Sequence, residues 1–96
     1  MKYIKLFEKV RPKYWLIRYN DDINYIKACL YKVGMSENDY WYNFALRQKE
    51  SFYLVKIGDE FTVSFLFEKE NLEEDADYQG EIIPDEYEIN AIKYNL

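Results

Sequence analysis

The stretch Phe52-Tyr-Leu-Val-Lys-Ile-Gly-Asp-Glu-Phe-Thr-Val-Ser-Phe-Leu-Phe67 decides the fold, because it has the pattern of a β-hairpin. Two runs rich in β-branched and aromatic residues flank Gly58-Asp59, and glycine in a two-residue loop supplies the positive φ that hairpin turns require. This loop places Ile57 opposite Glu60, Leu54 opposite Val63 and Phe52 opposite Phe65. One face of the hairpin then collects the apolar side chains Phe52, Leu54, Phe61, Val63, Phe65 and Phe67.

The residues before the hairpin predict a strand and a helix. The run 14–19 is rich in β-forming residues and apolar on both faces, which is typical of a strand covered on both sides. A helix is expected from about Asp22 to Val33, because apolar residues recur there at helical spacing after the cap candidates in 20–22. Gly34 is placed to end this helix in the left-handed conformation.

For three further segments the sequence pattern fits both a strand and a helix. The run 40–47 contains three consecutive aromatic residues, which favours a strand. In 87–96 the alternation of apolar residues also favours a strand, although Pro84-Asp85-Glu86 is an alternative helix start. The segment 2–10 fits either a short strand or a short helix.

Together these elements predict one α+β domain over residues 1–96, with an acidic loop at 68–81. We expect an antiparallel sheet of four or five strands with one amphipathic helix, 22–33, packed on a face. Tyr53, Val55 and Ile57 make the second face of this sheet apolar as well. One helix cannot cover both faces, so the second face needs the terminal segments, a partner or a second subunit, and a homodimer is one of these alternatives.

Composition suits a small aromatic core. Eleven Tyr, six Phe and two Trp supply large buried area in only 96 residues. The apolar runs are too short to span a bilayer, and the start of the chain has no signal-peptide pattern, so no membrane association is expected. Cys29 is the only cysteine, which excludes an internal disulfide and favours the cytoplasm. The chain is rich in Lys, Asn, Ile, Tyr and Glu, and short chains of this composition are frequent in phages and mobile elements. If the chain is encoded by a phage, the expected location is the cytoplasm of the host cell.

Charge is polarised along the chain. Residues 1–34 carry a net charge of +5 and residues 68–96 a net charge of −8, within a total of −5. In one interpretation the two ends neutralise each other in the fold. In the other, the acidic end binds a basic surface of a target protein, and one candidate is a surface that otherwise binds nucleic acid. The carboxylates proposed to contact this target are Glu68, Glu70, Glu73, Glu74, Asp75, Asp77 and Glu81.

The chain lacks the residue patterns of common catalytic sites. It has no His, and its three glycines cannot form a phosphate-binding loop. Cys29 has no His to activate it and falls on the apolar stripe of the expected helix, so it is interpreted as a core residue. No pair stands out among the eighteen acids. We therefore expect a non-enzymatic interaction protein, such as an inhibitor or modulator, with no cofactor unless calcium binds.

The calcium alternative comes from one segment. The sequence Asp75-Ala-Asp-Tyr-Gln-Gly-Glu-Ile-Ile-Pro-Asp-Glu86 resembles the twelve-residue calcium loop of the EF-hand family, with acids at positions 1 and 3, glycine at 6 and glutamate at 12. Position 5 is Gln rather than Asp or Asn. The resemblance implies oxygen ligands from the Glu81 carbonyl and from the side chains of Asp75, Asp77, Gln79 and Glu86.

A third interpretation is binding of single-stranded nucleic acid through 11–19. Basic residues interleaved with aromatic ones can hold a phosphate backbone and stack its bases. The residues concerned are Arg11, Lys13, Trp15 and Arg18. The net charge of −5 opposes the binding of a polyanion, and the aromatic residues are equally suited to the core, so nucleic acid is not the expected partner.

Overall fold

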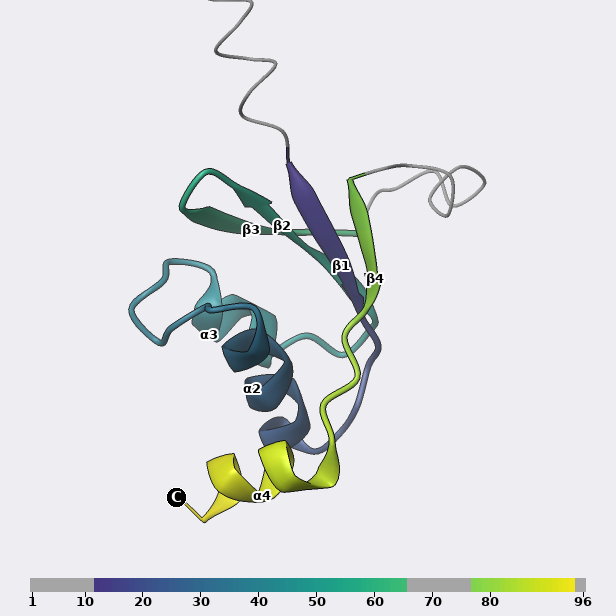
Figure 1. Cartoon of the computed structure of the whole chain (residues 1–96), viewed down its shortest axis with the longest axis vertical. Coiled ribbons are helices and arrows are strands. Elements are labelled where there is room, and N and C mark those ends of the chain that lie inside the picture. The colour runs from purple at the N-terminus through teal and green to yellow at the C-terminus, as the bar shows by residue number, and fades with distance from the viewer. Residues whose placement is uncertain (1–11, 66–76, 95–96) are drawn as a thin grey trace, which may run out of the picture.

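The computed structural model describes residues 12–65 and 77–94, which form one mixed sheet with helices packed on it (Figure 1). The α+β class and the four strands agree with the sequence prediction. In chain order the described elements are β1 (Lys13–Ile17), α2 (Ile23–Lys32), α3 (Tyr42–Leu46), β2 (Phe52–Ile57), β3 (Glu60–Ser64), β4 (Tyr78–Glu81) and α4 (Glu86–Lys93).

The predicted hairpin is confirmed with its register. β2 and β3 pair antiparallel with Ile57 opposite Glu60 and Leu54 opposite Val63, and Gly58 has a φ of 61° in the turn. β3 ends at Ser64, so Phe65 lies beyond the ladder, but its ring still packs 6.5 Å from that of Phe52. The turn glycine and the alternation of side chains therefore specify the same pairing.

The sheet is mixed, so the prediction of a strictly antiparallel sheet is wrong. Its strand order is β3-β2-β1-β4, and β4 runs parallel to β1. The Tyr14 amide donates to the Asp77 carbonyl at 3.2 Å and the Ile82 amide to the Leu16 carbonyl at 2.9 Å, at the two ends of this ladder. β4 belongs to the predicted loop 68–81, whose residues up to 76 lie outside the described part.

α2 agrees with its prediction at both ends. The Asp22 carboxylate caps it by accepting from the Asn24 amide at 2.9 Å. At the other end Gly34 has a φ of 89°, its amide donates to Tyr31, and the Met35 amide donates to Leu30, both at 3.0 Å. This pair of bonds is a Schellman motif, and the buried side chains of Met35 and Leu30 supply its apolar contact.

The prediction of a strand over 40–47 is wrong, because part of this run forms helix α3. The turn before it is held by Asp39, whose carboxylate accepts from the Ser36 amide at 2.7 Å. The Ala45 amide then donates to the Trp41 carbonyl at 2.9 Å, as in a helix. Tyr42 and Leu46, four residues apart, both pack against the core, so the aromatic residues are accommodated at helical spacing.

The preferred strand over 87–96 is also wrong, since α4 occupies this segment. Asp85 and Glu88 form a capping box in which the Glu88 amide donates to Asp85 at 2.7 Å and the Asp85 amide to Glu88 at 3.2 Å. This box satisfies backbone groups that a strand would leave to other partners, so the helix is favoured. The described part of the chain therefore contains three helices rather than one.

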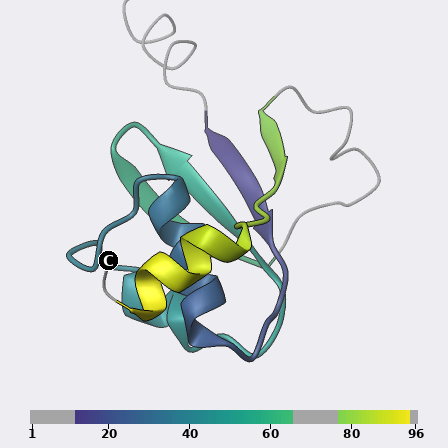
Figure 2. The same cartoon turned by 60° about the horizontal axis from the view of Figure 1, so that its bottom comes forward.

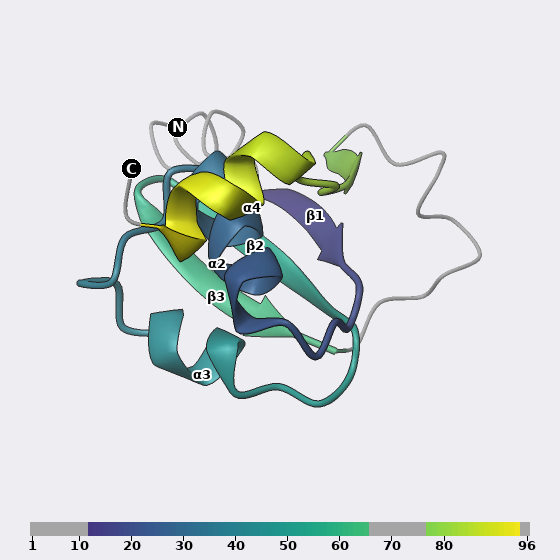
Figure 3. The same cartoon turned by 90° about the horizontal axis from the view of Figure 1, so that it is seen from below.

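The core lies between the sheet and α2. Trp15 and Ile17 of β1, with Leu54 and Phe52 opposite them, turn their side chains toward this helix. α4 packs against α2 (Figures 2 and 3). The fully or nearly buried residues of this cluster are Ile17, Ile26, Cys29, Leu30, Met35, Ala45, Phe52, Leu54, Phe61 and Ile82.

The second face of the sheet is apolar, as predicted. Tyr14, Tyr53 and Val55 form a separate cluster there, with Leu16 and Tyr78 packed against it. Their exposed fractions are 5%, 5% and 9%, and neither Tyr14 nor Tyr53 lacks a polar or ring partner. Ile57, at the hairpin end of the same face, is 48% exposed. A homodimer through this face stays a prediction.

Two predictions remain: a short element near the N-terminus and the absence of a membrane span. The short element expected in 2–10 lies outside the described residues. Of the helices that the structure describes, none combines the length and hydropathy needed to cross a bilayer.

Replacing Gly34 tests the end of α2. A Cβ at this position would meet no atom within 4 Å, so the cost of Gly34→Ala comes from the φ of 89° alone. We expect Gly34→Ala to lower the free energy of unfolding by about 1–2 kcal/mol in urea titrations. Gly34→Asn should cost less, because Asn tolerates the left-handed region. Equal stability of all three proteins would contradict the motif.

Candidate protein-binding surface

The acidic residues proposed as a binding site are only partly described. Asp77 precedes β4 and Glu81 is its last residue, while the five acids from Glu68 to Asp75 lie outside the described residues. The Glu81 carboxylate accepts a hydrogen bond from Arg18 Nε at 2.7 Å, and this contact raises the pKa of Arg18. One acid of the C-terminal third is thus neutralised by a cation of the basic N-terminal third.

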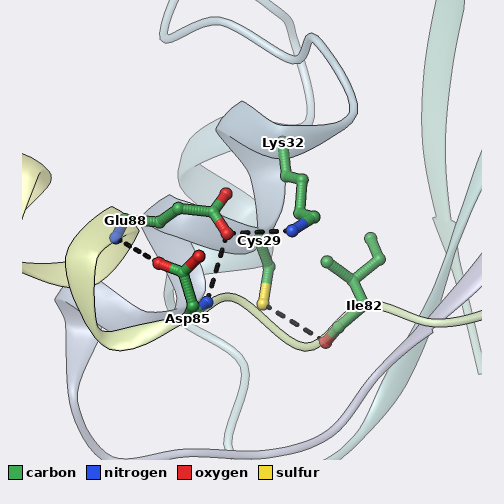
Figure 4. A network of polar contacts seen from close by, with 5 residues as sticks. All are labelled: Cys29, Lys32, Ile82, Asp85 and Glu88. Carbon is green, nitrogen blue, oxygen red and sulfur yellow. Dashed lines mark hydrogen bonds and ion pairs between the residues drawn. The ribbon is translucent and has the colours of Figure 1, made fainter.

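A second ion pair joins α2 to α4. Lys32 Nζ lies 2.9 Å from Glu88 Oε1, in the same network as the capping box (Figure 4). The hydrogen bond from Lys32 lowers the pKa of Glu88, and the same bond raises the pKa of Lys32. Glu88 therefore fixes the start of α4 and its position on α2, and its carboxylate is engaged within the protein.

Two other carboxylates lie at the start of α4, and that of Asp85 also caps the helix through Oδ1. Asp85 and Glu86 are both exposed, and Glu86 has no ion pair within 12–65 or 77–94. Both lie at the N-terminal end of the helix, where a negative charge is favoured by the helix dipole. The Glu86 carboxylate and the second oxygen of Asp85 can thus contact a partner without breaking the ion pair or the capping box.

α4 also presents apolar side chains outward. None of its residues is buried: Tyr87 is 79% exposed, and Tyr94, the residue that caps its C-terminal end, is 61% exposed. Tyr87, Ala91 and Tyr94 follow the i, i+4, i+7 spacing of one helix face, and Ile83, which is 65% exposed, precedes them. We call Ile83, Tyr87, Ala91 and Tyr94 the α4 stripe.

An open groove lies on the other side of α4, toward α2. It has a volume of about 260 Å³ and is lined mostly by apolar atoms. Tyr31, which is 74% exposed, stands at this groove on α2, and Ile92 reaches it from α4. The lining residues are Lys27, Tyr31, Met35, Ser36, Glu37, Tyr42 and Ile92. The helical layer therefore offers exposed tyrosines on both sides of α4.

Sequence reasoning missed the α4 stripe because it favoured a strand here. In a strand, Tyr87, Ile89 and Ala91 share a face, whereas in the helix Tyr87 groups with Tyr94 and Ile92 turns toward α2. The signal that would have found it is the pair Asp85 and Glu88, which has the spacing of a capping box.

The residues of the proposed calcium loop are distributed over different elements. Asp75 lies outside the described part, Gln79 and Glu81 belong to strand β4, and Glu86 opens α4. The Gln79 side-chain amide donates to the Asp77 carbonyl at 3.2 Å. Within the described ranges, no three acidic, cysteine or histidine side chains are grouped as metal ligands. Calcium binding stays a prediction.

Three of the residues proposed for nucleic-acid binding lie in the described part, and they are in or next to β1. Arg11 lies outside it, and Lys13 is exposed. Trp15 packs against the core on the α2 side, while Arg18 pairs with Glu81. Nucleic-acid binding through this strand also stays a prediction.

Cys29 has the properties of a core residue. Its exposed fraction is 0%, and its Sγ lies 3.7 Å from the Ile82 carbonyl oxygen (Figure 4). Burial raises the pKa of the thiol to about 12. A protonated, buried thiol is a poor nucleophile, which agrees with the interpretation made from the sequence.

Comparison of the chain with family models, curated proteins and solved structures found no match. The functional interpretation therefore rests on the surface described above.

The ion pair between Lys32 and Glu88 predicts a pH dependence. Because the pKa of Glu88 is lowered in the folded protein, its stabilising effect is present above the unfolded value of about 4.3 and is lost as pH falls through the lowered value. Glu88→Gln keeps a side chain able to complete the capping box but removes the charge. We expect thermal melting of this variant below that of the natural protein at pH 7.

The difference in melting temperature should shrink toward pH 3 and also in high salt, since the pair is solvent-exposed. Glu86→Gln is the control, because this carboxylate is on the same helix turn and makes no ion pair with described residues. A difference for Glu88→Gln that is unchanged from pH 7 to pH 3 would rule out the ion pair as its cause.

Burial of Cys29 predicts low thiol reactivity. In the native protein at pH 8, a water-soluble disulfide reagent should modify Cys29 only as fast as the core opens, because the thiol is both buried and protonated. The same reagent should react rapidly in urea. Fast modification in buffer, with the fold intact by circular dichroism, would contradict the described packing.

Proposed function

We propose that this chain is a non-enzymatic protein-interaction module that binds a target with a basic surface through the α4 stripe and the neighbouring carboxylates. The observation that carries the proposal is the exposure of α4: Tyr87 and Tyr94 stand 79% and 61% exposed on one face of a helix. An inhibitor or modulator role, in the cytoplasm of a phage-infected host or another cell, is part of the same proposal.

Tyrosine supports such a role for physical reasons. Its side chain buries a large area, carries a hydroxyl that can bond at an interface, and loses little conformational entropy on binding. Tyrosine is accordingly enriched among the residues that dominate binding energy. The two exposed tyrosines, together with Ile83 just before the helix, can fill an apolar pocket on a target, with the helix as a rigid support.

Charge supports the choice of a basic target. Asp85 and Glu86 stand exposed at the helix end next to the stripe. The acids from Glu68 to Asp75 belong to the same C-terminal third, whose net charge is −8. Clustered carboxylates attract a cationic surface and accelerate encounter, while the tyrosines provide contact after docking.

Site-specific photocrosslinking in cells tests the stripe. We expect benzoylphenylalanine at position 87 to crosslink to a discrete protein, because this position would lie inside the interface. The control is the same probe at Tyr40, which is 90% exposed but lies outside the helices. The proposal fails if position 87 gives no crosslinked protein, or if positions 87 and 40 give the same products.

The crosslinked protein, once identified and purified, allows the charge contribution to be tested. Asp85→Asn with Glu86→Gln removes two charges and keeps a capping side chain at position 85. We expect slower association and a weaker salt dependence, with little change in dissociation rate, by surface plasmon resonance. Neutralising Glu73, Glu74, Asp75 and Asp77 together tests the acidic segment in the same assay. Unchanged association rates in both variants would exclude a basic target surface.

A further inference from the structure

β3 forms one edge of the sheet. The strand order β3-β2-β1-β4 leaves its outer side unpaired within the described part of the chain, as Figures 1 and 2 show. An edge of this kind displays backbone donors and acceptors on which another strand can pair.

The register identifies which backbone groups face outward. In a hairpin with a two-residue loop the closing pair, here Ile57 and Glu60, is hydrogen-bonded, and bonded and non-bonded pairs alternate from it. Glu60, Thr62 and Ser64 therefore bond to β2, while the amides and carbonyls of Phe61 and Val63 point away. Among the described residues, no turn or loop supplies a backbone hydrogen-bond partner to these outward groups of Phe61 and Val63.

β3 lacks the features with which proteins usually protect an edge. Its sequence Glu60-Phe-Thr-Val-Ser64 contains no Lys and no Pro, and its pairing with β2 runs without a bulge. The opposite edge is different: β4 has only four residues, and its register with β1 shifts between Tyr14 and Leu16. Of the two edges, β3 is the one suited to pairing.

We infer that β3 pairs antiparallel with β3 of a second copy of this chain, centred on Thr62, to form one continuous sheet. This register places the outward backbone groups of Phe61 opposite those of Val63 in the second copy. By symmetry, Val63 lies opposite Phe61 of the second copy. It uses all five residues of the strand and creates a two-fold interface in which both copies present the same surface.

The side chains of β3 favour its own copy as the partner. In this register Glu60 lies opposite Ser64 of the second copy, so no like charges face each other. Phe61 lies opposite Val63, an apolar pair of the kind that stabilises neighbouring strands. Phe65, which is 39% exposed, follows the strand directly and comes within diagonal reach of Phe61 of the second copy. The inference is independent of the α4 stripe.

Sedimentation velocity over a range of protein concentrations tests the pairing. We expect a monomer–dimer equilibrium for the natural chain. Thr62→Lys places two ammonium groups face to face at the centre and should raise the dissociation constant at least about tenfold. Thr62→Val, which keeps the β-branched shape without charge, should still dimerise. A natural chain that stays monomeric throughout overturns the inference, as does a Thr62→Lys variant that dimerises like Thr62→Val.

Amide hydrogen exchange gives a second readout on the natural chain, which does not depend on whether a variant folds. The amides of Phe61 and Val63 should be protected only at concentrations where the dimer forms. Those of Thr62 and Ser64, which bond to β2, should be protected at every concentration. A dimer in which Phe61 and Val63 exchange as fast as in the monomer must form through another surface, and that result overturns the inference.

Discussion

The burial of β1 on both faces is the constraint on which the rest of the structure depends. Trp15 and Ile17 face the helical side, while Tyr14 and Leu16 face the second cluster, so each residue from 14 to 17 contributes to one core or the other. β1 also pairs with β2 on one side and β4 on the other. Without β1, β4 would have no partner and α4 would lose the strand that leads into it.

β4 and Ile82 connect β1 to the candidate surface and fix where α4 begins. Ile82 follows β4, donates its amide to Leu16 and buries its side chain in the main core. Its carbonyl lies against Cys29 of α2, and three residues later Asp85 caps α4. The pair between Lys32 and Glu88 then attaches this helix to α2. α4 is thus held by contacts around its start, which leaves Tyr87 and Tyr94 on the side that faces solvent.

Sequence reasoning succeeded where the signal was local. The hairpin at Gly58 and the helix ending at Gly34 are specified by turn residues and periodicity within about a dozen residues. β4 could not be found in this way, because Tyr78–Glu81 has no pattern of its own and becomes a strand by pairing with β1 some sixty residues earlier. In α3 and α4 the aromatic residues suggested strands. α4 is instead specified as a helix by its cap at Asp85, and α3 follows a turn that Asp39 closes on Ser36. The candidate surface was missed for the same reason, since the α4 stripe exists only if the segment is helical.

The two proposed interfaces use different residues of the chain. Pairing at β3 uses backbone groups at one edge of the sheet, whereas α4 packs against α2 on the helical side. A two-fold dimer would therefore carry two copies of the α4 stripe. Two linked binding sites hold a repeated or dimeric target more tightly than either site alone, without any additional contact, provided that both can engage together. The weak edge pairing of a short strand would then contribute to function through avidity, and a modest dimer affinity would suffice for it.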